Sequence, residues 1–370
     1  MSEPFPLIEI SGGPEERGRS YGQQAAVRIH KGIGHYTAQL QKLSLDAQML
    51  ASLVRDYVPV VDRFEPAYLE EMRGIAHGAK VSFEDVFMLN ARTEVLKLAA
   101  SPKLRERLHH ADDIDGCTGV VVMPGASRDG ELIHAQNWDW KHECAESAVV
   151  LRIRSKDGPD LLTFTEAGAL ARSGLNAAGI AITANYLESN LDYRQVGVPL
   201  ALIRRKVLEC EHLALALRAV YVTQKSGSNN MIVSHAGGIA IDFECAPDET
   251  FQVHPDDGLL VHANHWVSPV ALGKLKDTGV AGTPDSLYRD LRVRDLLAPQ
   301  RGNITVEAVK AALLDDFASP WSVCRPPRLN LASNLSATVA TIVLRPAQGM
   351  MEAAVLPALD PTFTTYRLNA

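Results

Sequence analysis

Helical periodicity dominates the first quarter of the chain. Apolar residues recur every three or four positions in "EERGRSYGQQAAVRIHKGIGHYTAQLQKL" and again in "AYLEEMRGIAHGAK", a spacing that places them on one face of a helix. "VSFEDVFMLNARTEVLKLA" continues the pattern, and Ser82, with Asp85 three positions later, has the residue type of a helix N-cap. The pattern predicts an α-rich region from Pro14 to about Ala100.

The pattern changes over residues 101–117. "SPKLRERLHHADDID" is polar and lacks hydrophobic periodicity, so we expect an exposed connection there. Short β-type runs follow, separated by Gly, Pro, Asp and Ser: "CTGVVVMPG", "GELIHAQNW", "AVVLRIRSKDG", "DLLTFTEAG" and "GLNAAGIAITANYL". Runs of this length with turn residues between them are typical of consecutive antiparallel strands.

Helices and strands alternate in the remainder of the chain. "PLALIRRKVLECEHLALALRAVYVTQ" has the length and apolarity of helices that pack on a sheet, and the following segment through "LLVHANHW" returns to strands. "PDSLYRDLRVRDLLAP" and "TVEAVKAALLDD" predict helices, and "SATVATIVLRPAQGMMEAAVLP" predicts a final pair of strands. The order favours an α+β fold of two antiparallel sheets with helices outside, rather than a parallel doubly wound sheet.

Composition and charge narrow the function classes. A hydrophobic fraction of 46% with 22% charged residues is ordinary for a soluble globular protein. The net charge of −7 leaves no basic face for a phosphate backbone, so we expect no nucleic-acid partner. No stretch reaches the roughly 20 apolar residues of a membrane span, and the first residues lack the pattern of a secretory signal. We therefore expect a cytoplasmic protein with no membrane partner.

One of the five cysteines stands at an unusual place. The five are scattered without a CxxC pair, so reduced thiols are expected. Cys117 lies between Gly116 and Thr118 at the start of a predicted strand. If the Gly116–Cys117 bond were cut, Cys117 would carry both a thiol and an α-amine with a pKa of about 7.7 to 8.0. That amine could take the thiol proton and return a proton to a leaving group. On this pair alone, a buried thiol at a strand start stays the alternative.

The glycine has a chemical use in such a cut. Without a Cβ, the Gly116 carbonyl is open to approach by the Cys117 sulfur, and the backbone can adopt the conformation that attack requires. An N-to-S acyl shift followed by hydrolysis would then cleave the chain between the two residues.

Several segments, in order along the chain, resemble one known family. "GPEERGRSYG", "EMRGIAHGAKVSFEDVFMLNARTE" and "DGCTG" precede "QNWDW", "EAG", "GLNAAGIAI" and "HANHW". Together they resemble the acyl-coenzyme A:6-aminopenicillanic acid acyltransferase (C45 peptidase) family of N-terminal nucleophile hydrolases. The resemblance covers most of the chain. It implies a four-layer αββα sandwich of two antiparallel sheets with a helical N-terminal leader, residues 1–116. Self-cleavage would make the leader a small subunit and residues 117–370 a large one, the two staying together as one globular unit.

The resemblance also implies roles for individual residues. Cys117 is the nucleophile that cleavage exposes, and Asp139 in "QNWD" orients its α-amine. Asn264 in "HANHW" is the amide donor of an oxyanion hole, and Arg325 in "SVCRPPR" is a fixed positive charge that favours thiolate. Gln136 stands where related bile-salt and penicillin V hydrolases have arginine, so no direct transfer from those enzymes is made.

Four further residues are candidates for substrate contact: Trp138, Glu166, Asn185 and His265. For Glu166 and Asn185, roles in turns or caps are the alternative. Because Trp138 and Trp140 flank Asp139, one of them is expected to line the pocket while the other packs outside.

The sequence favours neither a metal nor a cofactor. His262 and His265 lack zinc-ligand spacing with further partners, as does the pair His142 and Cys144, so hydrogen-bonded structural roles are expected for the histidines of "HANHW". "GLNAAGIAI" lacks the GxGxxG pattern of a dinucleotide site and predicts a tight turn into a strand.

These interpretations combine into one predicted activity with two alternatives. We expect a self-processing N-terminal cysteine amidohydrolase that cleaves a linear amide of a small N-acylated compound through a thioester acyl-enzyme. The first alternative is transfer of the acyl group, for example from acyl-CoA, to an amine such as 6-aminopenicillanic acid. The second is a non-enzymatic binding scaffold. The expected partners are a small amide substrate and the two cleavage fragments for each other, and a homo-oligomer is left open.

Overall fold

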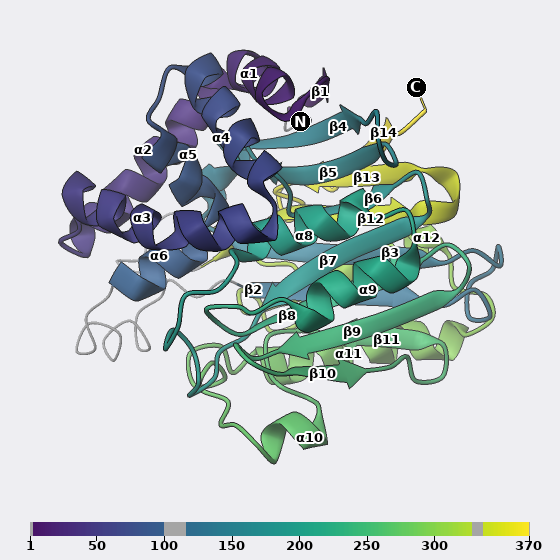
Figure 1. Cartoon of the computed structure of the whole chain (residues 1–370). Helices are drawn as coiled ribbons and strands as arrows, with labels where there is room; N and C mark the ends of the chain where they lie inside the picture. Colours follow the sequence, from purple (N-terminus) through teal and green to yellow (C-terminus); the bar gives the residue numbers. More distant parts are fainter. Residues whose placement is uncertain (1–2, 100–115, 328–335, 370) are drawn as a thin grey trace.

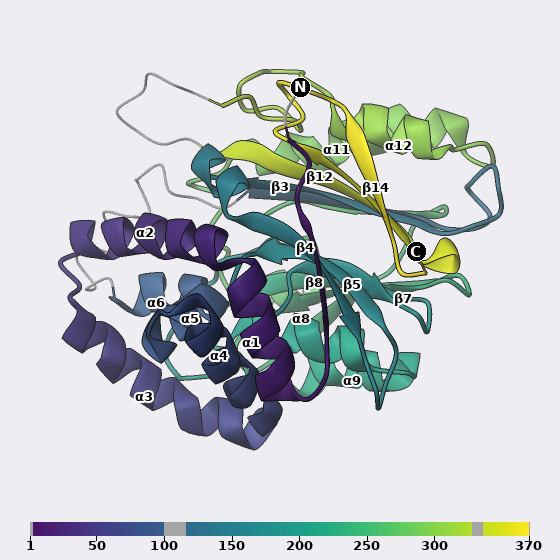
Figure 2. The same ribbon diagram turned by 90° about the horizontal axis from the view of Figure 1, so that it is seen from above.

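A computed structural model describes residues 3–99, 116–327 and 336–369 of the chain. In these ranges two β-sheets lie face to face and helices cover both outer faces (Figures 1 and 2). The connection predicted as exposed over residues 101–115 lies outside the described residues.

The larger sheet has eight strands in the part of the chain described. Its spatial order is β1 (Leu7–Ser11), β4 (Ala148–Arg154), β5 (Leu161–Glu166), β6 (Ser173–Asn176), β7 (Ile180–Tyr186), β8 (Asn229–His235), β9 (Ile239–Cys245) and β10 (Thr250–Val253). From β4 to β10 each strand pairs antiparallel with the next in this order. The turn predicted in "GLNAAGIAI" joins β6 to β7, where Asn176 Oδ1 accepts from the backbone of Ala178 and Ile180.

The smaller sheet has six described strands, all antiparallel. Its order is β11 (Leu259–His262), β2 (Gly116–Val122), β3 (Ile133–Trp140), β12 (Ala337–Arg345), β13 (Met350–Val355) and β14 (Phe363–Arg367). The sequence predicts a final pair of strands, which correspond to β12 and β13. The structure adds a third strand, since "FTTYR" forms β14 at the outer edge beside β13.

Helices complete the four layers. The pair α8 (Leu200–Glu209) and α9 (Leu213–Val222) packs on the eight-stranded sheet, and the pair α11 (Ser286–Leu297) and α12 (Val306–Leu313) packs on the six-stranded sheet (Figure 2). The short elements are η1 (His142–Glu146), α10 (Pro269–Leu272), η2 (Ala298–Gln300) and η3 (Pro346–Gln348). The predicted αββα layer order is confirmed.

The leader contributes six helices among its described residues. They are α1 (Pro14–Gln24), α2 (Ala26–Lys42), α3 (Ala47–Phe64), α4 (Pro66–Ala79), α5 (Phe83–Asn90) and α6 (Arg92–Ala99). The predicted cap is present, since Ser82 Oγ accepts a 3.1 Å hydrogen bond from the Asp85 backbone. The α-rich character of this region is confirmed.

Helices α1 and α4 approach each other unusually closely. A Cβ on Gly18 would lie 2.2 Å from the Glu71 carbonyl oxygen, and one on Gly74 would lie 2.3 Å from that of Glu15. No side chain fits at either position, so the glycines of "RGRSYG" and "RGIAHG" allow this helix pair to form.

A strand at the start of the leader departs from the prediction of purely antiparallel sheets. β1 pairs parallel with β4, with Leu7 opposite Val150. Its alternation of exposed and buried residues buries Ile8 and Ile10. The leader and the remainder of the chain therefore share one sheet.

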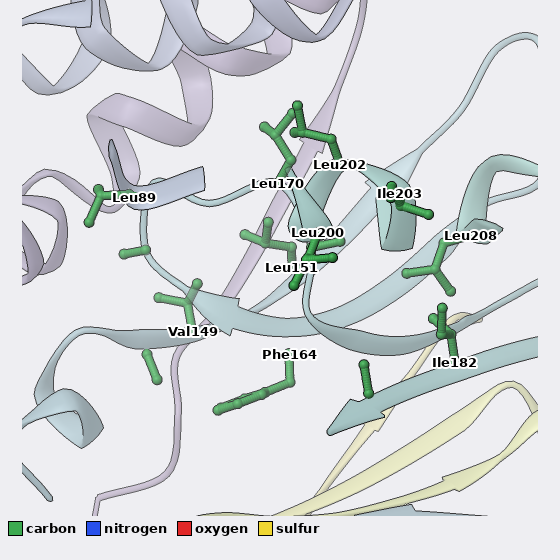
Figure 3. Close-up of a cluster of buried hydrophobic side chains, with 14 of the residues drawn as sticks. Leu89, Val149, Leu151, Phe164, Leu170, Ile182, Leu200, Leu202, Ile203 and Leu208 are labelled. Carbon is green, nitrogen blue, oxygen red and sulfur yellow. The ribbon is translucent and has the colours of Figure 1, made fainter. Parts of the chain in front are cut away.

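They also share one core. Figure 3 shows Leu89 of α5 in the same buried cluster as Phe164 of β5 and Leu200 of α8. The leader is thus packed as part of the domain, and the Gly116–Cys117 junction lies within this shared body.

None of the helices in the part of the chain that the structure describes combines the length and the apolar character of a membrane span.

Candidate active site

The Gly116–Cys117 junction lies at the beginning of β2, in the six-stranded sheet. Gly116 is opposite Asp139 and Cys117 is opposite Trp138 on β3. Both residues of the junction are buried. The strand pairing therefore fixes the junction beside the residues of the "QNWDW" motif.

Strand alternation sends neighbouring side chains to opposite faces of this sheet. Thr118 contacts Arg289 of α11, on the outer, helix-covered face. A Cβ on Gly119 would lie 2.8 Å from Ile232 of the eight-stranded sheet, on the inner face. Cys117 is two residues from Gly119, so its side chain faces the space between the sheets and joins the core there.

Gly116 is a site of close approach. A Cβ on this residue would lie 2.8 Å from Asp139 Oδ2 and 2.9 Å from Arg325 Nη1. The absence of a side chain thus makes room for two of the residues that the family resemblance had assigned to the site.

Asp139 and Arg325 are held together by a threonine. Thr338 Oγ1 donates a 2.7 Å hydrogen bond to Asp139 Oδ1 and accepts one of 2.8 Å from the Arg325 backbone. Arg325 Nε lies 3.5 Å from Asp139 Oδ2. Burial raises the pKa of the Asp139 carboxyl, and the nearby Arg325 and Arg289 counteract only part of that rise. The pair lies beside the Gly116–Cys117 junction.

Asn264 contacts the cysteine nitrogen directly. Its Oδ1 accepts a 2.8 Å hydrogen bond from Cys117 N, and its Nδ2 donates to the Tyr186 carbonyl at 2.9 Å. The amide oxygen thus faces the atom that cleavage would turn into an α-amine. The oxyanion-hole role stays a prediction, and it would use the second hydrogen of Nδ2.

Two charged residues at this site were not foreseen. Asp285 Oδ2 accepts from Arg289 Nε at 2.7 Å and also from Arg325 Nη2. Burial would raise the pKa of Asp285, but the two arginines outweigh burial and lower it. The sequence contained a sign of this burial. Arg289 stands four residues before Val293, so the two share one face of α11, and that face is buried. A charge on an apolar stripe marks a buried interaction.

The candidates for substrate contact fall in different places. Glu166 and Asn185 line a cavity at the end of the eight-stranded sheet, under α5, α6 and α8. Its charged lining consists of Glu166 together with Arg92, Glu94, Arg172 and Arg204. Arg92 Nε lies 2.9 Å from Glu166 Oε2, and Asn185 Nδ2 donates to the carbonyls of residues 262 and 263.

Trp138 and His265 are not among the residues that line this cavity. Trp138 is fully buried between the sheets, with the Arg172 guanidinium 4.2 Å from its ring. His265 Nδ1 lies 2.8 Å from Ser286 Oγ at the start of α11. The cavity and the junction are linked through Trp138, which is opposite Cys117 and touches Arg172.

The expectation that Trp138 and Trp140 separate is wrong. Residues two apart on a strand share a face, so both lie opposite to Asp139 and both are buried. Trp140 Nε1 donates to Tyr36 OH of α2 at 3.1 Å. The second tryptophan therefore packs against the leader.

The histidines of "HANHW" have hydrogen-bonded structural positions. His262 Nε2 lies 2.9 Å from Glu244 Oε1, and the backbone nitrogens of Val267 and Ser268 also donate to Glu244. This contact fixes the loop that carries Asn264. Among residues 3–99, 116–327 and 336–369, no group of three or more His, Cys, Asp or Glu is arranged to hold a metal ion.

Comparison with solved structures gives low overall similarity. A mutant form of conjugated bile acid hydrolase from Clostridium perfringens is 12% identical, with 68% of this chain and 92% of that chain covered and a TM-score of 0.48. Penicillin V acylase from Agrobacterium tumefaciens is 15% identical, with 68% and 86% covered and a TM-score of 0.46.

Comparison at the level of sequence is more informative. The "Acyl-coenzyme A:6-aminopenicillanic-acid-acyltransferase 40 kDa form" of Emericella nidulans is 29% identical over 326 residues, which cover 86% of this chain and 84% of that protein. The family model of acyl-coenzyme A:6-aminopenicillanic acid acyl-transferase matches residues 126–355, a range that contains Asp139, Asn264 and Arg325 and begins after Cys117. This chain belongs to the acyl-coenzyme A:6-aminopenicillanic acid acyl-transferase family.

Proposed function

We propose that this protein is a self-processing N-terminal cysteine amidohydrolase that acts on a small N-acylated compound. One observation carries the proposal: Asn264 Oδ1 lies 2.8 Å from the Cys117 nitrogen at a buried Gly-Cys junction. Asp139 and Arg325 lie against the glycine of the same junction. A buried backbone N–H needs an acceptor in any case, but the charged pair of Asp139 and Arg325 beside the glycine is not needed by a thiol that only fills the core.

Processing begins at the precursor's own backbone. Cys117 Sγ attacks the Gly116 carbonyl carbon, the C–S bond forms, and the C–N bond breaks as the nitrogen takes a proton. Water then hydrolyses the thioester, which leaves a carboxylate on Gly116 and a thiol and α-amine on Cys117.

Turnover repeats the same chemistry on a substrate amide. The α-amine of Cys117 accepts the thiol proton, the sulfur attacks the amide carbonyl, and the departing amine takes that proton. Water resolves the thioester and releases the acid. Asp139 and Asn264 hold the α-amine in place, and the positive charge of Arg325 favours the thiolate.

Acyl transfer uses the same acyl-enzyme and is the second candidate. The name of the Emericella nidulans relative supports it, since that name describes transfer to 6-aminopenicillanic acid. Hydrolysis is favoured here because water is always present, whereas transfer requires a second bound amine.

The first test is intact mass and N-terminal sequencing of purified protein. We expect two fragments that stay associated, the larger beginning "CTGVV", and one uncleaved, inactive chain for Cys117→Ala. Cys245→Ala, a buried cysteine on β9, is the matched control and should mature. A wild-type chain that stays whole after long incubation would support a binding scaffold instead.

The second test defines the reaction. Small N-acyl amides, penicillins and aminoacyl amides are scored for amine release, with and without 6-aminopenicillanic acid as acceptor. Release of free acid independent of the acceptor supports hydrolysis, and an acylated acceptor as the main product supports transfer.

A further inference from the structure

Arg289 of α11 uses its guanidinium to connect the backbone of the cysteine with its neighbours. Its side chain is fully buried. Nη1 donates to the Cys117 carbonyl oxygen at 2.7 Å and to Thr118 Oγ1 at 2.8 Å. Nη2 donates to Asn264 Oδ1 at 2.8 Å, and Nε donates to Asp285 at 2.7 Å. Each nitrogen of the guanidinium therefore donates to Cys117 and its neighbour Thr118, to Asn264, or to the counter-ion Asp285.

These contacts define the orientation of Asn264. A guanidinium only donates hydrogen bonds, so the Asn264 atom that it touches is the oxygen. The same oxygen accepts from Cys117 N at 2.8 Å. Arg289 thus keeps an acceptor, rather than the amide NH₂ group, directed at the cysteine nitrogen.

The arrangement also brings a fixed positive charge near that nitrogen. Arg289 Nη2 and Cys117 N each lie 2.8 Å from Asn264 Oδ1, so they are at most about 6 Å apart. The Asp285 carboxylate on the far side of Arg289 partly compensates this charge. A nearby positive charge disfavours a protonated amine.

Other titratable and charged groups surround the junction. The packed elements contribute Asp139 on β3, Tyr186 on β7, His265 after β11, Asp285 directly before α11, Arg289 and Asp290 on α11, and Arg325 before β12. Arg289 and Asp285 form a buried ion pair in this set, because the arginines lower the pKa of Asp285. Removing the charge of Arg289 or of Asp285 therefore changes the local charge by a full unit.

We propose that Arg289 is a positioning residue that directs the Asn264 oxygen at the Cys117 nitrogen and whose charge, tuned by Asp285, keeps the mature α-amine in its neutral, proton-accepting form. This inference rests on the proposed function, because it concerns the amine that self-cleavage creates. It assigns a role to two residues outside the family motifs from which the site was first recognised.

The test is the pH dependence of kcat/KM for amine release, measured on full-length preparations that have matured. The acidic limb of this profile reports the essential base of the free enzyme. In Arg289→Gln the loss of a positive charge favours the protonated form of the Cys117 α-amine and raises its pKa. We therefore expect the acidic limb to shift to higher pH by roughly one unit. In Asp285→Asn both arginines lose this counter-ion, so the positive charge near the α-amine is less compensated. The acidic limb should therefore shift to lower pH.

A purely structural role would lower activity without moving the limb. Thermal unfolding of each variant is recorded in parallel, so that a loss of folded protein is seen directly. Arg292→Gln is the matched control: Arg292 lies on the same helix and forms a partly buried pair with Asp315 at 2.6 Å, away from the junction contacts of Arg289. Its profile should superimpose on that of the wild type.

Opposite shifts in the two variants support the proposal, and an unmoved limb in a folded, cleaved Arg289→Gln enzyme overturns it. If Arg289→Gln folds but stays uncleaved, Asp285→Asn decides: a downward shift supports the proposal and any other result overturns it. A wild-type protein that neither matures nor turns over amides is a different result, because it removes the proposed function itself.

Discussion

Thr338 donates a 2.7 Å hydrogen bond to Asp139 from the neighbouring strand β12. The same hydroxyl accepts from the backbone nitrogen of Arg325, so a single buried oxygen sets the relative position of an acid and an arginine beside the junction.

We predict that Thr338→Val slows self-cleavage at least tenfold and lowers the free energy of unfolding by about 1–3 kcal/mol, because it leaves Asp139 Oδ1 and the Arg325 nitrogen without this partner. Thr341→Val is the control, since Thr341 is buried on the same strand and donates to Asn137 at 2.6 Å. It should show a similar loss in urea unfolding with normal cleavage. Equal cleavage rates in the two variants would contradict the role of Thr338.

Gly116→Ala is predicted to block maturation. The added Cβ would lie 2.8 Å from Asp139 Oδ2 and 2.9 Å from Arg325 Nη1, so one of these groups must move, at about 1–3 kcal/mol. Gly125→Ala is the control, because nothing lies within 4 Å of its added Cβ. Fragment formation is followed by denaturing gel over time. Normal maturation of Gly116→Ala would show that this close approach has no importance for cleavage.

Glu71 is predicted to be essential for attachment of the leader. It is fully buried on α4, where Arg17 lies 2.6 Å away and Arg205 of α8 lies 3.2 Å away. Glu71→Gln leaves the buried Arg205 with a single carboxylate partner, Glu209 on its own helix, and we expect a loss of about 1–3 kcal/mol in urea unfolding. Glu15→Gln breaks only an exposed pair with Arg19 and should cost less than about 1 kcal/mol. Similar losses in both variants would contradict this prediction.

The stability of the loop that carries Asn264 is predicted to depend on pH. Burial alone would lower the pKa of His262, but Asp242 and Glu244 outweigh it and raise the pKa to about 9. A raised pKa in the folded state means that the stabilisation is fully present below the ordinary value of about 6.5 and is lost as pH rises through about 9. The unfolding free energy should fall by ~3 kcal/mol over this window.

The variant Asp242→Asn tests whether His262 causes this fall in unfolding free energy. It removes a carboxylate 3.9 Å from His262 Nε2, so the decline in unfolding free energy between pH 7 and 9.5 should become shallower. Identical slopes for variant and wild type in chemical unfolding would exclude His262 as the source.

Most of the architecture could be read from hydrophobic spacing alone. The helices of the leader, the runs around "CTGVVVMPG" and the pair α8 and α9 have long or strongly periodic patterns, and each was predicted in the right class. β1 was missed because a strand of only five residues is too short to show a clear periodic pattern. Its parallel pairing with β4 joins segments about 140 residues apart in the sequence. Such a pairing leaves no local signal.

The site was only partly visible in the sequence. Cys117, Asp139, Asn264 and Arg325 lie close together in the structure, and the roles that the family resemblance implies for them stay predictions. Asp285 and Arg289 were not anticipated, because their roles depend on how α11 packs against β2 and on which residues meet there. The expectation that Trp138 and Trp140 separate was wrong for a simpler reason: the two-residue period of a strand puts both on the same face.

The parallel pairing of β1 with β4 has a consequence for any attempt to produce the large fragment by itself. Without residues 7–11, β4 becomes the outermost strand of its sheet, and its unpaired backbone groups form a template on which further chains can assemble. The segment that the proposed cleavage would detach therefore also covers an edge of the sheet, and a recombinant chain starting at Cys117 should precipitate or form fibrils where the full-length chain stays dispersed.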